Sequence, residues 1–226
     1  MTHKYGITDT TRRYGGRTLH QIRALRDIPR HGVTAADLGG WIEHERNLSQ
    51  DGDCWIADNA RVGGNANVWD NARVWGNARV WDNASVWGNA NVGDNARVWG
   101  NARVWDNASV WGNANVGDNA RVWGNANVGG NANVGDNAEI LAPQHVLTIG
   151  PIGSEGVTVT LHRTVDGHAL HVGCWQDGTI DGLMAEVERR RSDREGWDER
   201  WTAEYEALVP LLRLRANSFH AAVADV

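Results

Sequence analysis

A six-residue repeat runs through the middle of the chain and limits its fold more than any other feature. An aliphatic residue occupies every sixth position from Ile56 to Ile140, an Ala follows four positions later, and an Asn precedes each of those Ala residues. The slot before the Asn is always Asp or Gly. An even period suits strands, whose side chains alternate between two faces, and does not fit a helix. Because one repeat cannot bury its own aliphatic residue, the repeats must stack. We therefore predict a β-solenoid over residues 56–141, with the aliphatic and Ala side chains in a shared narrow core.

The repeat resembles that of the hexapeptide-repeat family, whose motif is an aliphatic residue, a Gly-like residue, two variable positions, a small residue and a variable one. Val92-Gly93-Asp94-Asn95-Ala96 is a close match. The resemblance implies a mainly β fold, a left-handed parallel β-helix with three sides and about eighteen residues per coil. On that basis, residues 56–140 would form about four to five coils.

The two flanks are expected to close the ends of the rod, because a solenoid has to hide its first and last strand edges. Residues 1–55 are predicted to form a β cap with irregular first repeats, since Ile42 and Leu48 are also six positions apart. Residues 142–226 are predicted to form an α+β domain with three strands, including 157–163 and 168–174, and two helices, at about 179–191 and 198–215. Pro210 is expected to bend or interrupt the second helix.

Parts of both flanks are similar to hexapeptide-repeat proteins encoded by phages and prophages, which often carry the label transferase. Residues 38–43, 47–49 and 52–55 match the entry segment of those proteins, and residues 150–154, 173–175 and 178–179 match their C-terminal module. The similarity covers nearly the whole chain. It implies a homo-oligomer, with a trimer favoured, in the cytosol of a bacterial host.

Tryptophans form the most conspicuous outward pattern of the repeat. With about eighteen residues per coil, one corner holds a Trp in four successive layers at ~4.8 Å spacing, close enough for offset stacking. This ladder either braces the corner or forms an interaction stripe against another subunit or a partner. Its members are Trp69, Trp87, Trp105 and Trp123. The variable slot holds arginines that we expect to be scattered over the faces and mostly solvated, namely Arg61, Arg73, Arg79, Arg97, Arg103 and Arg121.

An internal duplication also bears on the fold. Residues 74–97 and 98–121 are identical. A copy of four hexads fills about one and a third coils, so it moves the copied surface onto a different face. Rod length and core would then matter more than the chemistry of any one face.

Catalytic residues are hard to find on the repeats. The resemblance implies that an acyltransferase of this family would use a His as general base, with acyl-CoA between subunits. Here, no His lies between His44 and His145. These two histidines flank the rod and are the remaining candidates for such a site. We interpret the turn carboxylates, such as Asp82 and Asp106, as turn formers.

Two further clusters in the C-terminal region are candidate sites. An Asp166-Gly167 hairpin loop would place His162 opposite His171, as a cross-strand pair able to bind a metal or an anion. The alternative is two solvated imidazoles. A basic run could contact an anion, or could equally be a solvated helix face. It comprises Arg189, Arg190, Arg191 and Arg194.

Composition narrows the function classes. The 226-residue chain has a formal net charge of −6, which argues against non-specific nucleic-acid binding. We expect no membrane span, because no apolar run is long enough. Cys54 and Cys174 form no metal or redox motif and are expected to be buried thiols. No cofactor is predicted.

The function that we predict is a non-enzymatic, phage-type scaffold that associates with itself and engages or blocks a host factor. One alternative is an acyltransferase of the hexapeptide family. A second is a sponge that holds a small anion or a nucleotide in grooves between subunits. Ice binding is disfavoured, because the repeat carries no Thr array.

Overall fold

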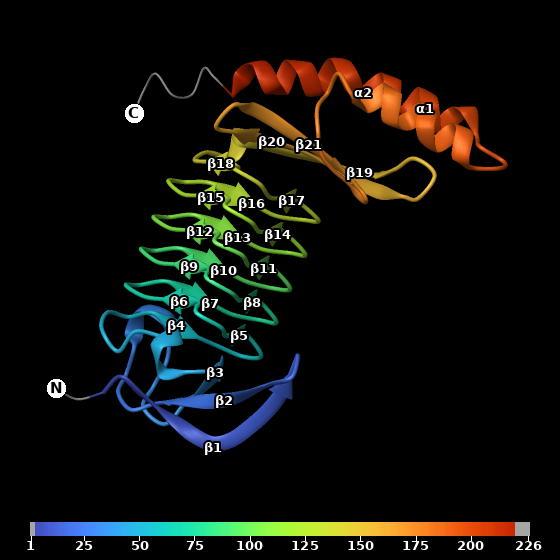
Figure 1. Cartoon of the computed structure of the whole chain (residues 1–226). Coiled ribbons are helices and arrows are strands. Elements are labelled where there is room, and N and C mark those ends of the chain that lie inside the picture. The colour runs from blue at the N-terminus through green and yellow to red at the C-terminus, as the bar shows by residue number, and fades with distance from the viewer. Residues whose placement is uncertain (1–2, 220–226) are drawn as a thin grey trace.

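The computed structural model, which describes residues 3–219, shows a parallel β-solenoid with an antiparallel sheet and two helices at its C-terminal end (Figure 1). Each turn gives one strand to each of three parallel sheets. Strands from neighbouring turns pair residues that are 18 positions apart, as Val80 pairs with Val98. The predicted fold class is thereby confirmed as a solenoid with an 18-residue turn.

The three sheets are named here for their outer surfaces. The trough sheet comprises β3 (Leu38–Ile42), β5 (Arg61–Val62), β8 (Arg79–Val80), β11 (Arg97–Val98), β14 (Asn115–Val116) and β17 (Asn133–Val134). The ladder sheet comprises β6 (Asn67–Val68), β9 (Ser85–Val86), β12 (Arg103–Val104), β15 (Arg121–Val122) and β18 (Glu139–Ile140). The third sheet comprises β4 (Trp55–Ile56), β7 (Arg73–Val74), β10 (Asn91–Val92), β13 (Ser109–Val110) and β16 (Asn127–Val128).

The solenoid has about six turns, more than the regular repeats alone provide. The extra length comes from the irregular first repeats, as predicted. Ile42 pairs with Val62 in parallel, and Leu48 forms a bridge to Val68. The coil therefore begins at β3, before the strict sequence pattern starts.

The core confirms the packing prediction. Every repeat aliphatic residue from Ile56 to Ile140 is at most 1% exposed, and the repeat Ala residues from Ala60 to Ala138 are at most 2% exposed. Full burial of a Val contributes roughly 1.5–3 kcal/mol. The Ala side chains are small enough to let three sheets meet around one shaft.

Two residues of the repeat have different roles at each corner of the solenoid. The Asp or Gly slot adopts positive φ, as at Asp82 (60°) and Gly76 (67°). The Asn that follows instead forms side-chain ladders; for example, Asn83 Nδ2 donates to Asn101 Oδ1 at 3.1 Å. Both residues lie in the turn, and the Asn ladder is a feature that was not predicted from the sequence. Each ladder satisfies the amide with its own copy in the next layer.

The N-terminal cap is an antiparallel extension of the trough sheet. β1 (Tyr5–Tyr14) pairs with β2 (Arg17–Ala24) through a turn at residues 15–16, and β2 pairs with β3. This hairpin covers the first edge of that sheet. Single 3₁₀ turns occur at Pro29–His31, Glu45–Asn47 and Pro143–His145.

The C-terminal end is a four-stranded antiparallel sheet covered by two helices. The strands are β19 (Val146–Ile152), β20 (Val157–Thr164), β21 (Gly167–Val172) and β22 (Trp175–Gly178), and the helices are α1 (Leu183–Asp193) and α2 (Glu199–Ser218). The fourth strand, β22, adds to the three that were expected. Pro210 lies inside α2, which continues through it to Ser218.

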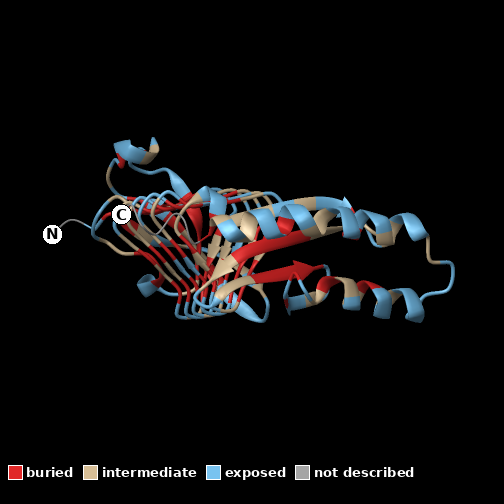
Figure 2. Ribbon diagram, turned by 90° about the horizontal axis from the view of Figure 1, so that it is seen from above, coloured by how far each residue is buried: buried red, intermediate tan, exposed pale blue. Residues whose placement is uncertain are grey.

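The two central strands of this sheet, β20 and β21, are buried on both faces. Val159, Leu161 and Leu170 pack with side chains of α1 and α2 in one cluster. On the opposite face, Thr160 and His162 are buried where β20 contacts β17 and β18 of the last turn. Figure 2 shows the buried residues along the strands and the exposed ones on the outward sides of both helices. Within residues 3–219, no helix is long and apolar enough to cross a bilayer.

One of the two cysteines differs from the expectation. Cys54 is buried in the first turn, where Lys4 Nζ donates to its Sγ at 3.0 Å. Cys174 is exposed in the connection between β21 and β22. Both are free thiols.

Candidate functional site

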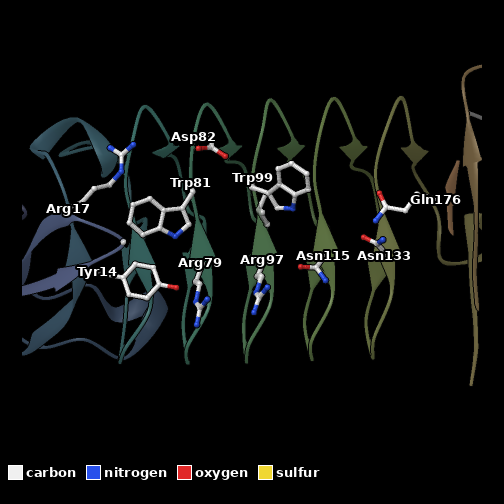
Figure 3. Close-up of a pocket in the computed structure, with 12 residues that line it drawn as sticks. Tyr14, Arg17, Arg79, Trp81, Asp82, Arg97, Trp99, Asn115, Asn133 and Gln176 are labelled. Atoms are coloured by element: carbon white, nitrogen blue, oxygen red, sulfur yellow. The ribbon is translucent and has the colours of Figure 1, made fainter. Parts of the chain in front are cut away.

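A trough lies on the outer face of the trough sheet, between the two caps. Its volume is about 590 Å³ (Figure 3). Tyr14, Gly15 and Arg17 of the N-terminal hairpin close one end, and Gln176 of β22 stands at the other. The trough is thus framed by the two caps and floored by the coils between them.

The floor is a single column of side chains, because strands of consecutive turns pair in register. Arg61 pairs with Arg79, and Arg79 with Arg97. The column continues with Asn115 and Asn133. At ~4.8 Å per layer, three cations therefore precede two amides along the column. Arg79, Arg97 and the two Asn residues line the trough, whereas Arg61 lies one layer beyond its lining.

These arginines lack acidic partners. Among the described residues, no ion pair involves Arg61, Arg79 or Arg97. Burial, together with the positive charges of Arg12 and Arg79, lowers the pKa of Arg61. The guanidinium groups of Arg61 and Arg79 lie 4.7 and 5.1 Å from the centre of the Tyr14 ring. An aromatic ring therefore holds two of the three guanidinium groups in place of a carboxylate.

Two indoles line the trough and lean apart. Trp81 lies over the backbone of Gly63 in the preceding turn and stacks on Tyr14 at 5.7 Å. Trp99 lies over Gly117 in the following turn and is 40% exposed. Because the slots of neighbouring turns hold Gly, each ring can fold down, and the space between the rings stays open (Figure 3).

Sequence reasoning missed this site. The repeat arginines are distributed over all three sheets, as expected, but three of them form one column, which was not predicted from the sequence. The signal was available, because Arg61, Arg79 and Arg97 are spaced by 18 residues. What the sequence alone does not supply is Tyr14 and Gln176, which come from the caps.

The predicted Trp ladder is present on the corner of the ladder sheet. Ring centres are 5.1 Å apart for Trp69 and Trp87, 4.9 Å for Trp87 and Trp105, and 4.9 Å for Trp105 and Trp123. All four rings are half-buried. The stacking itself is therefore shown, whereas a partner for the stripe remains a prediction.

The histidine pair lies in a different register from the one predicted. Thr164 pairs with Gly167, so the hairpin loop is Val165-Asp166, and His162 faces Ala169. The two imidazoles lie diagonally, with ring centres 4.9 Å apart. They are also buried rather than solvated, because their face of the sheet covers the last turn. Burial lowers the pKa of His162 to about 3. His171 instead points toward two carboxylates.

The remaining sequence candidates are engaged elsewhere. His145 is buried against Phe219, and burial is the main reason that its pKa falls to about 4. His44 begins the 3₁₀ turn at Glu45–Asn47. Asp82 and Asp106 occupy positive-φ turns, and their carboxylates accept the backbone N–H of the next layer, at Gly100 and Gly124. This supports their interpretation as turn formers.

The basic run of α1 is matched by acids on the helices. Arg189 contacts Glu186 and Asp193, and Arg190 contacts Glu186 and the carbonyl of Val172. Arg191 pairs with acids of both helices, and Arg194 lies 5.3 Å from the centre of the Trp201 ring. None of the four lines the trough.

Comparison with known proteins adds no family to this picture. No protein-family model matches the chain, and no curated protein matches it significantly.

Proposed function

We propose that this protein is a non-enzymatic binding scaffold whose trough captures a compact anionic ligand with a planar group, such as a nucleotide. The observation that carries the proposal is the unpaired arginine column beside two diverging indoles. Arginine binds phosphate oxygens through paired N–H groups, and its neighbours Trp81 and Trp99 offer aromatic faces for a ring.

The rigidity of the site supports capture over catalysis. The floor residues stand on strands whose neighbouring side chains are locked in the coil core, so the column is fixed before a ligand arrives. The described lining of the trough contains no His, Cys or Ser, and its one carboxylate, Asp82, already accepts the backbone N–H of Gly100. Acyl transfer finds less support, since His145 is buried away from this surface.

The resemblance to phage proteins suggests a biological role. A scaffold that removes an anionic signal, or that occupies an acidic surface of a host factor, would block a host response without turnover. We propose this role on the resemblance alone, and the host factor is defined only by its negative charge.

The test is titration calorimetry on the full chain with AMP, ATP and inorganic pyrophosphate, using adenosine as the uncharged comparison. We expect the nucleotides to bind more tightly than adenosine, with no product formed. Arg97→Ala should weaken binding at least tenfold, because a hydrogen bond to a charged group contributes about 1.5–3 kcal/mol.

Arg103→Ala is the matched control, since Arg103 fills the same repeat slot on β12 of the ladder sheet. It should leave binding unchanged. Equal losses in both variants, or no binding of any of these anions, would exclude the trough as an anion site.

Self-association through the Trp ladder is a second candidate function. The half-exposed stack forms a strip of aromatic surface along a whole edge of the rod, of the kind that is enriched at interfaces. Sedimentation velocity should show a trimer that dissociates in a Trp87→Ala/Trp105→Ala double variant. A monomeric parent chain at micromolar concentration would contradict this second proposal.

A further inference from the structure

The Asp residues at the corners of the solenoid follow a spacing rule that becomes visible when positions 18 residues apart are compared. Along each corner of the coils from Asp58 to Asp136, an Asp layer is followed by a Gly layer, as Asp82 is followed by Gly100. The carboxylate then accepts the backbone N–H of that Gly, at 3.2 Å for this pair. The alternation keeps like charges two layers apart.

The rule is broken at one place in these coils. Asp118 is followed by Asp136 in the next layer of the same corner. The Asp136 backbone N–H still lies 3.4 Å from Asp118 Oδ2, so two carboxylates occupy adjacent layers. Such a pair is unfavourable unless a proton or a cation lies between or beside the charges.

A third carboxylate extends this acidic column into the terminal sheet. Asp177 of β22 shares a hydrogen bond with Asp136, and this contact is the main reason that the pKa of Asp136 rises to about 7. Two carboxyl groups therefore lie side by side, in an arrangement that a bound cation would stabilise.

A buried imidazole faces the same point. The His171 side chain is 4% exposed, and its Nε2 lies 3.3 Å from Asp177 Oδ1. No hydrogen bond of suitable geometry reaches Nε2 from the described residues. Burial lowers the pKa of His171.

The surroundings leave room for an ion and orient the ring. The Asn133 Nδ2 atom lies 3.1 Å from His171 Nδ1. A 180° turn of the carboxamide would place its oxygen there to accept the Nδ1 proton, which would leave Nε2 free as a ligand. Gly135 stands beside the cluster; a Cβ there would lie 2.9 Å from Asp118 Oδ2 and 3.6 Å from His171 Cε1. Any larger residue would fill the space.

We propose that Asp136, Asp177 and His171 bind one divalent transition-metal ion, which ties the last coil to the terminal sheet. One ligand atom from each residue lies within 4.8 Å of the other two. Metal–ligand distances of about 2.0–2.2 Å then require the half-buried Asp136 and the exposed Asp177 carboxylates to move inward.

The donor set indicates the class of ion. Two carboxylates with one neutral imidazole suit Zn²⁺ or Mn²⁺, whereas Ca²⁺ and Mg²⁺ prefer oxygen ligands alone. Asp136 comes from the coil, and His171 and Asp177 come from β21 and β22, so the ion would be a cross-link between two parts of the fold.

The experiment is calorimetry and thermal unfolding of the full chain, freed of metal by a chelator, with Zn²⁺, Mn²⁺ and Mg²⁺ as probes. We expect Zn²⁺ or Mn²⁺ to bind at one ion per chain and to raise the melting temperature. Asp136→Asn and Asp177→Asn should each weaken that binding at least tenfold. Asn tolerates the positive φ of both positions, 49° and 58°, so the backbone should persist.

Asp94→Asn is the matched control, because Asp94 fills the same repeat slot and binds Gly112 N at 3.0 Å, far from the cluster in sequence. It should bind the ion like the parent chain. Retention of a one-to-one site in the Asp136→Asn/Asp177→Asn double variant would overturn the proposal, as would the lack of such a site in the parent chain. Mg²⁺ binding as tightly as Zn²⁺ and Mn²⁺ would overturn the assigned class of ion.

Discussion

The coils and the junction beneath the terminal sheet bury different chemistry although they share one rod. The coil interior holds aliphatic and Ala side chains in layer after layer. The junction instead buries His145, Thr160, His162 and His171. The regular coils need no buried polar side chain, because the backbone groups of each turn form hydrogen bonds to the next turn in register. The junction joins a parallel and an antiparallel sheet that do not pair in register, so each buried His or Thr side chain needs its own partner or has to stay uncharged.

This difference teaches where function can arise in a repeat protein. Identical layers offer the same surface many times, and new chemistry appears where the repetition stops or is varied. Both the trough and the acidic column depend on contacts with a cap. Substitutions in the regular coils and at the junction should therefore have different effects on stability.

The largest effect should follow from a charge in the coil core. Val98→Asp places an unpaired carboxylate in a shaft where Val98 is 0% exposed, at a cost of several kcal/mol. We expect loss of the folded state, measured by circular dichroism and proteolysis. The adjacent exposed substitution Arg97→Asp should remain folded. A stable Val98→Asp rod would show that the interior is not a dry shaft.

The next effect concerns pH and belongs to the junction. The unfolded chain binds a proton on His162 near pH 6.5, whereas the native state resists protonation until about pH 3. Stability is therefore complete above pH 6.5 and falls as the pH is lowered. At pH 5 the loss from this residue is about 2 kcal/mol, at about 1.4 kcal/mol per pH unit.

Denaturant unfolding at pH 7.5 and pH 5 measures this loss. In His162→Leu the difference between the two pH values should shrink, and in His3→Leu, at an exposed position, it should persist. An unchanged difference in His162→Leu would place the acid sensitivity outside the junction.

A smaller effect is expected on the outer surface of the coils. Trp105→Ala removes two stacking contacts of 4.9 Å, whereas Trp111 is 45% exposed and belongs to no stacked pair among the described rings. Trp105→Ala should therefore be more destabilising than Trp111→Ala by about 1 kcal/mol, since aromatic pairs contribute roughly 0.5–1.5 kcal/mol each. Equal losses of stability in the two variants, measured by thermal unfolding, would mean that stacking contributes nothing beyond the burial of apolar surface.

The smallest effect should come from the amide ladders. Asn101→Ser breaks two exposed side-chain hydrogen bonds of 3.1 Å, and Asn125→Ser breaks one at 3.4 Å. We expect losses of about 0.5–1 kcal/mol for Asn101→Ser and half of that for Asn125→Ser. A larger loss at Asn125 would show that the ladders act cooperatively along the rod.

The sequence predictions of the fold were confirmed in the regular coils and were less accurate in the terminal sheet. The solenoid, its core residues and the Trp stack were predictable because each depends on residues at fixed spacing. The histidine register was wrong because a hairpin loop of Val165-Asp166 was not distinguishable from one of Asp166-Gly167, and one step moves every cross-strand partner. The exposed Cys174 and the strand β22 depend on how the terminal sheet ends.

The amino-acid sequence by itself determined the coil, since each turn contacts only its neighbours and a local pattern repeated along the chain is enough to define it. The tertiary structure alone decided the trough and the acidic column. Tyr14 reaches Arg79, and Asp177 reaches Asp136, only after caps of unrelated sequence dock on the rod. No periodic rule describes such contacts, because they join segments whose patterns differ.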